Sequence, residues 1–396
     1  MAGMPRPSES RSTADLLPGT RSRFNPAAVA GFCLLAIVAA AAADDWPTFR
    51  NGPLQQGLAA SELSDSPEVI WTREAADGVT ATAAIVDGRV YVGTLCGQVW
   101  CLELTTGDEV WSYQTELPED SFRPGFNAGA AVAFDTVFIG DEEGVLHAID
   151  QQTGQARWTL PTEGEIDASA MPVTLDAGPS VLVGSHDGNL YCVDAQTGQP
   201  RWTYSIGDRI SCSTAIGEGR TFLAGCDGEL HIVDLATGES PGKLPLGSPT
   251  LAAPALRDNR LYVATQAGAV MALDLATDQP AWTREFGGDI RSSAAVTDDL
   301  VLIGNRDKTL RALDRASGEV RWESRSRSRI DSSPVVAGNV VVFGSNARSV
   351  TGVSLADGKE LWSIPTKRGV SSSPAIADGV LVIGVEGPDG ALLGIK

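Results

Sequence analysis

The side chains that could take part in catalysis or metal binding are few and far apart in this sequence. The three histidines, His147, His186 and His231, fall in different predicted strands or turns, and none has a cysteine or carboxylate at the spacing of zinc ligands. The acidic turn at 141–144 offers the oxygen ligands that Ca²⁺ prefers, although solvated acidic turns are far commoner than calcium sites. No phosphate-binding loop or nucleophile elbow is present. These residues therefore predict no catalytic group and no bound metal.

The cysteines do not form a disulfide framework. Apart from Cys33 near the N-terminus, they are odd in number and scattered, at Cys96, Cys101, Cys192, Cys212 and Cys226. Cys212 and Cys226 lie on opposite arms of one predicted hairpin and could face each other. The sequence leaves two alternatives for this pair, a disulfide or two buried thiols that pack as small apolar groups.

These residues must be positioned by a repeated unit, of which GNLYCVDAQTGQPRW is one of seven variants. Six variants carry a tryptophan at the same place, and Gly242 stands where it is missing from the fourth. The step between successive units runs from 40 residues (322 to 362) to 47 residues (111 to 158). A period of this length is typical of β-propeller blades.

Each unit contains four predicted strands, and the innermost is dominated by Ala, Ser, Gly and Thr, as in VTATAAI and IDSSPVV. Eight such inner strands occur. The last unit ends at 390–395 without an outer strand, whereas the strand at 68–72 has no unit of its own, so the two should pair and leave no free edge. The fold class is therefore all-β: an eight-bladed β-propeller with four-stranded antiparallel blades, closed by its N- and C-terminal strands.

Two recurring residue types have structural roles in this prediction. Aspartates such as Asp150 and Asp314 precede the Thr-Gly or Ser-Gly turns and can accept backbone N–H bonds there. The repeated tryptophans can fill the wedge between neighbouring blades. We expect this blade-docking role for Trp71, Trp111, Trp158, Trp202, Trp282, Trp322 and Trp362.

The N-terminal region differs from the repeats. A polar leader with Arg21 and Arg23 precedes an apolar run at 27–43 that ends in small residues suited to cleavage before Asp44. We expect residues 1–43 to be a signal peptide or an uncleaved N-terminal anchor, 44–66 an extension, and 67–396 the propeller. The protein should thus be exported to the periplasm or the cell exterior, with membrane contact only through such an anchor.

The repeat pattern Ala-x-Asp-x-x-Thr-Gly-x-x-x-Trp, clearest at 192–202 and 311–322, resembles the tryptophan-docking motif of the quinoprotein (PQQ-like) propeller family. The segment DWPTFRNG at 45–52 also looks like the opening of secreted bacterial PQQ-like repeat proteins. The resemblance covers residues 67–396 and implies the propeller fold. It leaves two functions, because the family contains quinone-dependent dehydrogenases and non-enzymatic scaffolds such as the outer-membrane-assembly propeller lipoprotein, to which this chain is closest in type.

A PQQ-dependent alcohol or sugar dehydrogenase of this family must hold PQQ with Ca²⁺ and place a carboxylate base beside it, which requires long insertions. Here most repeats have a minimal length of 40 residues, and no vicinal Cys-Cys pair is present. Only Asp167, Asp331 and Arg291 could point towards the ring axis. We therefore expect a non-catalytic scaffold without a cofactor, possessing an interaction face for other envelope proteins, and keep the dehydrogenase as the alternative.

Two surface features indicate where partners bind. The formal net charge of -20 excludes nucleic acid as a general partner, yet one quadrant is basic and predicts docking of an anionic protein. Its residues are Arg306, Lys308, Arg325, Arg327, Arg329, Arg348, Lys367 and Arg368. The second feature is the loop at 115–126, whose Phe122, Arg123, Pro124 and Phe126 are types that anchor interfaces. The alternatives are a solvated surface and a loop whose aromatic rings fold back over the channel mouth.

Overall fold

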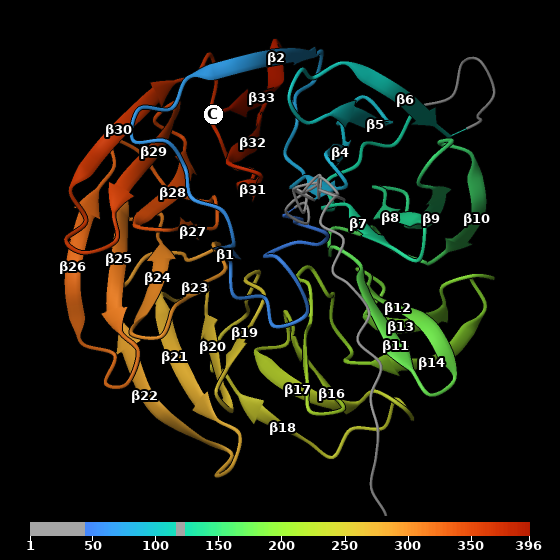
Figure 1. Cartoon of the computed structure of the whole chain (residues 1–396). Coiled ribbons are helices and arrows are strands. Elements are labelled where there is room, and N and C mark those ends of the chain that lie inside the picture. The colour runs from blue at the N-terminus through green and yellow to red at the C-terminus, as the bar shows by residue number, and fades with distance from the viewer. Residues whose placement is uncertain (1–43, 116–122) are drawn as a thin grey trace, which may run out of the picture. The chain divides into compact units, whose positions relative to one another are not determined.

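The computed structural model describes residues 44–115 and 123–396, which form a ring of eight four-stranded antiparallel sheets around a central channel (Figure 1). Those residues contain strands and turns but no helix, and hence no helix that could cross a bilayer. The predicted eight-bladed propeller is confirmed. The expected leader at 1–43 lies outside the described residues.

The first four blades, numbered along the chain, each use four consecutive strands. They are blade 1 with β3 (Ala84–Val86), β4 (Arg89–Gly93), β5 (Gln98–Glu103) and β6 (Glu109–Gln114); blade 2 with β7 (Ala131–Ala133), β8 (Thr136–Gly140), β9 (Val145–Asp150) and β10 (Ala156–Pro161); blade 3 with β11 (Met171–Leu175), β12 (Gly178–Gly184), β13 (Asn189–Asp194) and β14 (Pro200–Ser205); and blade 4 with β15 (Ala215–Gly217), β16 (Arg220–Ala224), β17 (Glu229–Asp234) and β18 (Gly242–Pro245).

The other four blades follow the same order, except that blade 8 takes its outer strand from the N-terminal part of the chain. They are blade 5 with β19 (Ala255–Arg257), β20 (Arg260–Ala264), β21 (Ala269–Asp274) and β22 (Gln279–Glu285); blade 6 with β23 (Ala295–Val296), β24 (Leu300–Gly304), β25 (Thr309–Asp314) and β26 (Val320–Arg325); blade 7 with β27 (Val335–Ala337), β28 (Val340–Ser345), β29 (Ser349–Ser354) and β30 (Glu360–Pro365); and blade 8 with β31 (Ala375–Ala377), β32 (Val380–Val385), β33 (Gly390–Ile395) and β2 (Val69–Ala75).

The ring closes as the sequence predicts. Strand β2 pairs antiparallel with β33, with Thr72 opposite Leu393, and the backbones of Glu68 and Lys396 exchange two hydrogen bonds of 2.9 Å. Both chain segments are therefore fixed in one sheet. The first and last strands of the ring meet within a blade, where main-chain hydrogen bonds join them.

The segment at 44–66 is more than an extension, because it lies across one end of the channel (Figure 1). Its Trp46 pairs with Ile85 of blade 1, and β1 (Leu58–Ala59) adds to β27 of blade 7. Its carbonyl groups also accept N–H bonds of 2.7–3.0 Å from the inner strands of five blades, at Val132, Ile216, Leu256, Val296 and Val336. The segment thus satisfies inner-edge N–H groups that would otherwise lack partners inside the ring.

Six tryptophans dock on the following blade as expected. Each indole Nε1–H donates to a backbone carbonyl of the next blade at 2.8–3.1 Å. Each ring also covers a turn glycine with positive φ; a Cβ on Gly198, for example, would lie 2.6 Å from Trp158. The docked residues are Trp71, Trp111, Trp158, Trp202, Trp282 and Trp322.

Two blade junctions depart from this pattern. The buried Nε1 of Trp362 has no hydrogen-bond partner among the described residues. At the junction of blades 4 and 5, Gly242 replaces the tryptophan, and the receiving turn has Asp278 at φ +55° instead of glycine. A cavity of about 510 Å³ lies there, against Gly242, Leu273 and Asp278. This junction therefore lacks both the indole and the turn glycine that an indole covers at the other junctions.

The remaining structural expectations concern turns and thiols. The Asp150 carboxylate accepts backbone N–H bonds from Gln152 and Thr153 at 3.1 and 2.8 Å, as predicted. All five described cysteines are free thiols, so the disulfide alternative for Cys212 and Cys226 is not adopted. Cys212 instead donates to the carbonyl of Ala224 at 2.9 Å.

Candidate functional site

The antiparallel blades determine which loops share a face. Connections between second and third strands, such as 305–308, emerge on the same side as the loops between successive blades, such as 326–334. We call this side the loop face and the opposite side the hairpin face. All the predicted basic residues come from connections of the loop face or from the strand ends beside them.

Three of these residues line one cavity of about 330 Å³ between blades 6 and 7, which we call the basic groove. Arg325 comes from the end of β26, Arg327 from the loop that follows, and Arg348 from the turn between β28 and β29. Serine and threonine side chains of both blades line the cavity together with Phe343, Ala347 and Pro365, and the only acidic residue among these lining residues is Glu360.

The guanidinium groups of the basic groove are unpaired. Within residues 44–115 and 123–396, the side chains of Arg325, Arg327 and Arg348 have neither an ion pair nor a hydrogen bond. Elsewhere in the same blades arginines are paired, as in Arg311, whose Nη2 lies 2.6 Å from Asp307. Because the whole chain is strongly acidic, three unpaired cations around one hollow form a local site of attraction for anions.

Two turns beside the groove have an unfavourable backbone conformation. Arg348 and Lys308 adopt φ values of 61° and 73°, in the turn position where Gly97, Gly188 and Gly228 stand in other blades. A side chain at positive φ costs about 1–2 kcal/mol relative to glycine. Other turns of the described chain also hold non-glycine residues at positive φ, such as Asp87 and Asn259.

Four of the other predicted basic residues are paired. Arg306 and Arg329 converge on Asp331, with Nε–carboxylate distances of 2.7 and 3.1 Å, and Asp331 raises the pKa of Arg306. Lys367 and Arg368 make looser pairs with acidic side chains, at 3.7 and 3.8 Å. Arg325, Arg327 and Arg348 therefore differ from these four residues, because their charges have no acidic partner in the described chain.

The second predicted feature, the loop at 115–126, needs a correction. Phe126 is fully buried, and its ring packs edge-on to His147 at 5.4 Å between centroids, so it cannot be an exposed anchor. Arg123 is exposed and donates to the carbonyl of Thr115 at 3.4 Å, while Phe122 lies outside the described residues. The repeats contain the missed signal, because Phe126 aligns with the buried Ile166, and each stands five residues before the inner strand of its blade.

The channel is narrow. Its cavity of about 170 Å³ is lined by Asp167, Arg291 and Asp331, as predicted, and otherwise mainly by small residues. Ligand pockets in proteins usually measure about 300–1,000 Å³. The channel serines are also engaged between blades, since Ser333 Oγ accepts from Ser293 N at 2.9 Å and Ser373 Oγ from Ser333 N at 3.0 Å. These residues do not fit a large planar quinone.

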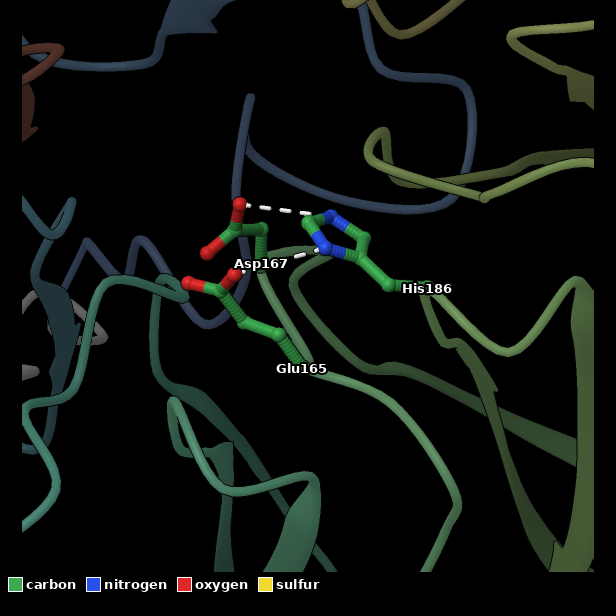
Figure 2. A group of neighbouring side chains, drawn as sticks. All are labelled: Glu165, Asp167 and His186. Carbon is green, nitrogen blue, oxygen red and sulfur yellow. Dashed lines mark ion pairs between the residues drawn. The ribbon is translucent and has the colours of Figure 1, made fainter.

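Sequence reasoning missed one cluster at the channel mouth. It treated His186 as isolated, but the fold brings this side chain against Glu165 and Asp167 from the segment that leads into blade 3 (Figure 2). The spacing along the chain gives no sign of this, because the contact depends on the turn between β12 and β13 meeting the loop between blades 2 and 3.

A closed ring of four-stranded blades with indole docking, a narrow channel and a charged face defines a propeller of the quinoprotein-like class. The model of one family, outer membrane protein assembly factor BamB, matches residues 60–241 and 226–388. The chain belongs to this family.

Solved structures share the fold at low sequence identity. BamB from Moraxella catarrhalis is 19% identical with a TM-score of 0.69, covering 84% of this chain and 98% of that one. Quinohemoprotein alcohol dehydrogenase from Comamonas testosteroni is 15% identical with a TM-score of 0.75, covering 89% and 80%. A europium-containing methanol dehydrogenase is 13% identical with a TM-score of 0.75, covering 89% and 98%. No curated protein sequence matches the chain.

Proposed function

We propose that this protein is an exported, non-catalytic scaffold that binds acidic segments of other envelope proteins in the basic groove. The observation that carries the proposal is the set of three unpaired arginines around one cavity, in a chain whose net charge is -20. Membership of the BamB family supports a role in assembling envelope or outer-membrane proteins. The apolar run at 27–43 supports export.

The chemistry of the groove favours carboxylates in an extended segment. Arginine presents a planar fork of donors that matches a carboxylate, and each charge-assisted hydrogen bond is about twice as strong as a neutral one. At about 330 Å³ the cavity is near the small end of ligand sites, which suits one or two acidic side chains. The acidic remainder of the surface repels such a partner, so the attraction is confined to this place.

The alternative function is a PQQ-dependent dehydrogenase. Two of the three solved structures named above are dehydrogenases by name. Their sequence identity to this chain is so low that the likeness shows the fold alone. The cavity volume and the engaged serines of the channel favour the scaffold. We therefore propose no cofactor and no chemical step.

The proposal is tested with a short fluorescein-labelled peptide rich in aspartate, measured by fluorescence anisotropy. We expect saturable binding that weakens at higher salt and falls at least about tenfold when Arg325, Arg327 and Arg348 are all changed to Glu, since each lost charged bond is worth about 1.5–3 kcal/mol. A matched variant changes Arg220, Arg321 and Lys359 to Glu, on the hairpin face or the outer strands, and alters the net charge equally. If both variants weakened peptide binding equally, the effect would come from net charge, and the basic groove would not be the binding site.

A further inference from the structure

Two of the three histidines are held in closed hydrogen-bond relays. His231 Nδ1 lies 2.9 Å from the Tyr204 hydroxyl, and its Nε2 lies 2.8 Å from Asp227. His147 has the same kind of partners, a tyrosine hydroxyl at 3.1 Å and an aspartate at 2.8 Å. Both imidazoles are buried, and both ring nitrogens of each are satisfied at ordinary hydrogen-bond distances.

His186 differs from both in its geometry. Its Nε2 stands 3.4 Å from Asp167 Oδ2 and its Nδ1 stands 3.4 Å from Glu165 Oε2, too far for good hydrogen bonds (Figure 2). The side chains nonetheless face one another across a fixed gap, because the backbone N–H of His186 donates to the carbonyl of Glu165 at 2.8 Å. Ser211 Oγ lies 3.0 Å from His186 Nε2. The cluster is thus preorganised but open.

The three side chains lie within reach of one small metal ion. Glu165 and Asp167 face different imidazole nitrogens, so small side-chain rotations would bring both carboxylates to the one nitrogen that ligates the ion. One ligand atom from each of the three side chains lies within 4.8 Å of the others. In addition, the buried Oδ1 of Asp167 has no hydrogen-bond partner, although Asp167 lines the channel mouth.

We propose that Glu165, Asp167 and His186 bind one divalent transition-metal ion of the zinc type at the mouth of the channel. An imidazole nitrogen with two carboxylates is a donor set that suits Zn²⁺, whereas Ca²⁺ and Mg²⁺ prefer oxygen ligands alone. The fourth position faces the channel, where water or the Ser211 hydroxyl completes the tetrahedron.

The local charges favour a cation at this place. The Glu165 and Asp167 carboxylates both lie against one imidazole, 3.4 Å from its two nitrogens. A divalent ion between them would offset the mutual repulsion of two like charges held in one place.

Isothermal titration of ZnCl₂ into the purified protein, after EDTA treatment and desalting, tests the proposal. We expect one-to-one binding that excess Ca²⁺ does not displace, weakened at least about tenfold by Asp167→Asn and by His186→Gln. Asp227→Asn is the matched control, because Asp227 has the same residue type in the closed relay of His231, and it should leave the affinity unchanged. Unfolding midpoints of each variant verify the fold.

Several results would overturn the proposal. A protonated imidazole that only bridges two carboxylates predicts no saturable heat with the wild-type protein. Unaltered affinity in a folded Asp167→Asn variant would place the ion elsewhere, as would equal weakening by Asp227→Asn. Displacement by an equal concentration of Ca²⁺ would exclude the imidazole as a ligand.

Discussion

The empty docking position between blades 4 and 5 allows a quantitative test of how the ring is held together. At this junction Gly242 replaces the tryptophan and Asp278 replaces the turn glycine, beside a cavity of about 510 Å³. We predict that Gly242→Trp combined with Asp278→Gly restores the arrangement seen at the six docked junctions. The new indole should cover residue 278 and donate to the carbonyl of Leu275, which corresponds to the acceptor Leu235 of Trp202.

The expected gain follows from burial and its opposing terms. A docked indole removes about 150–250 Å² from water, worth about 4–6 kcal/mol at 25 cal/mol per Å² as an upper value. The indole hydrogen bond adds about 1 kcal/mol, whereas ordering the side chain and the new turn glycine costs about 2–3 kcal/mol. The double variant should therefore be more stable by about 2–5 kcal/mol, nearer the lower end because the burial figure is an upper value.

The two changes should also depend on each other. In the docked junctions a Cβ on the turn residue would lie within 2.8 Å of the indole, as at Gly238 beneath Trp202. Gly242→Trp alone therefore meets the Cβ of Asp278 and gains little, and Asp278→Gly alone has no ring to receive. Equilibrium unfolding in guanidinium chloride measures all four proteins as a double-mutant cycle. A double variant no more stable than the sum of the single variants would refute the docking account.

Three further predictions use contacts of the same structure. Trp282→Phe should destabilise the protein by about 1 kcal/mol more than Trp362→Phe in guanidinium unfolding, because only Trp282 donates a hydrogen bond to the next blade; equal losses would contradict this. Arg157, and then Thr153, lower the pKa of Asp150 to about 2, and Arg321 with Ser317 does the same for Asp314. Both folded-state pKa values lie below the ordinary 3.8, so the stability that these two carboxylates contribute is complete above about pH 4 and is lost as the pH falls towards 2. In a pH series of unfolding midpoints, the variant with Asp150→Asn and Asp314→Asn should therefore lose less stability over this pH range than the wild-type protein. Burial raises the pKa of the Cys101, Cys192 and Cys212 thiols to about 12. In native protein lacking residues 1–43, the partly exposed Cys96 should therefore react first with a disulfide reagent at about pH 8. Equally fast reaction of the buried thiols would show that the blades open.

The repeat made most of the fold predictable from the sequence. A tryptophan period near that of a blade, together with unpaired strands at 68–72 and 390–395, was enough to predict eight blades and their closure. The position of the segment at 44–66 across the channel was not predictable in this way. Its contacts are backbone hydrogen bonds to inner strands, which depend on position in the ring rather than on side-chain pattern.

The candidate sites were predictable only in part. Loop order along the chain placed the basic residues on one face, but their pairing depends on side-chain reach, so Arg306 and Arg348 looked alike until Asp331 was seen to bind the former. Phe126 resembled an interface anchor because its residue type was weighed without its position in the repeat. The partnership of His186 with Glu165 is a contact between separate loops, for which a single sequence has no local signal.

Calorimetric titration of the purified protein with two ligands decides whether the loop face binds acidic protein segments or the channel binds a quinone. One titration uses the aspartate-rich peptide, and the other uses PQQ with Ca²⁺. We expect saturable heat with the peptide, lost in the variant with Arg325, Arg327 and Arg348 changed to Glu, and no saturable heat with PQQ. Saturable one-to-one binding of PQQ without binding of the peptide would contradict the scaffold and favour the dehydrogenase.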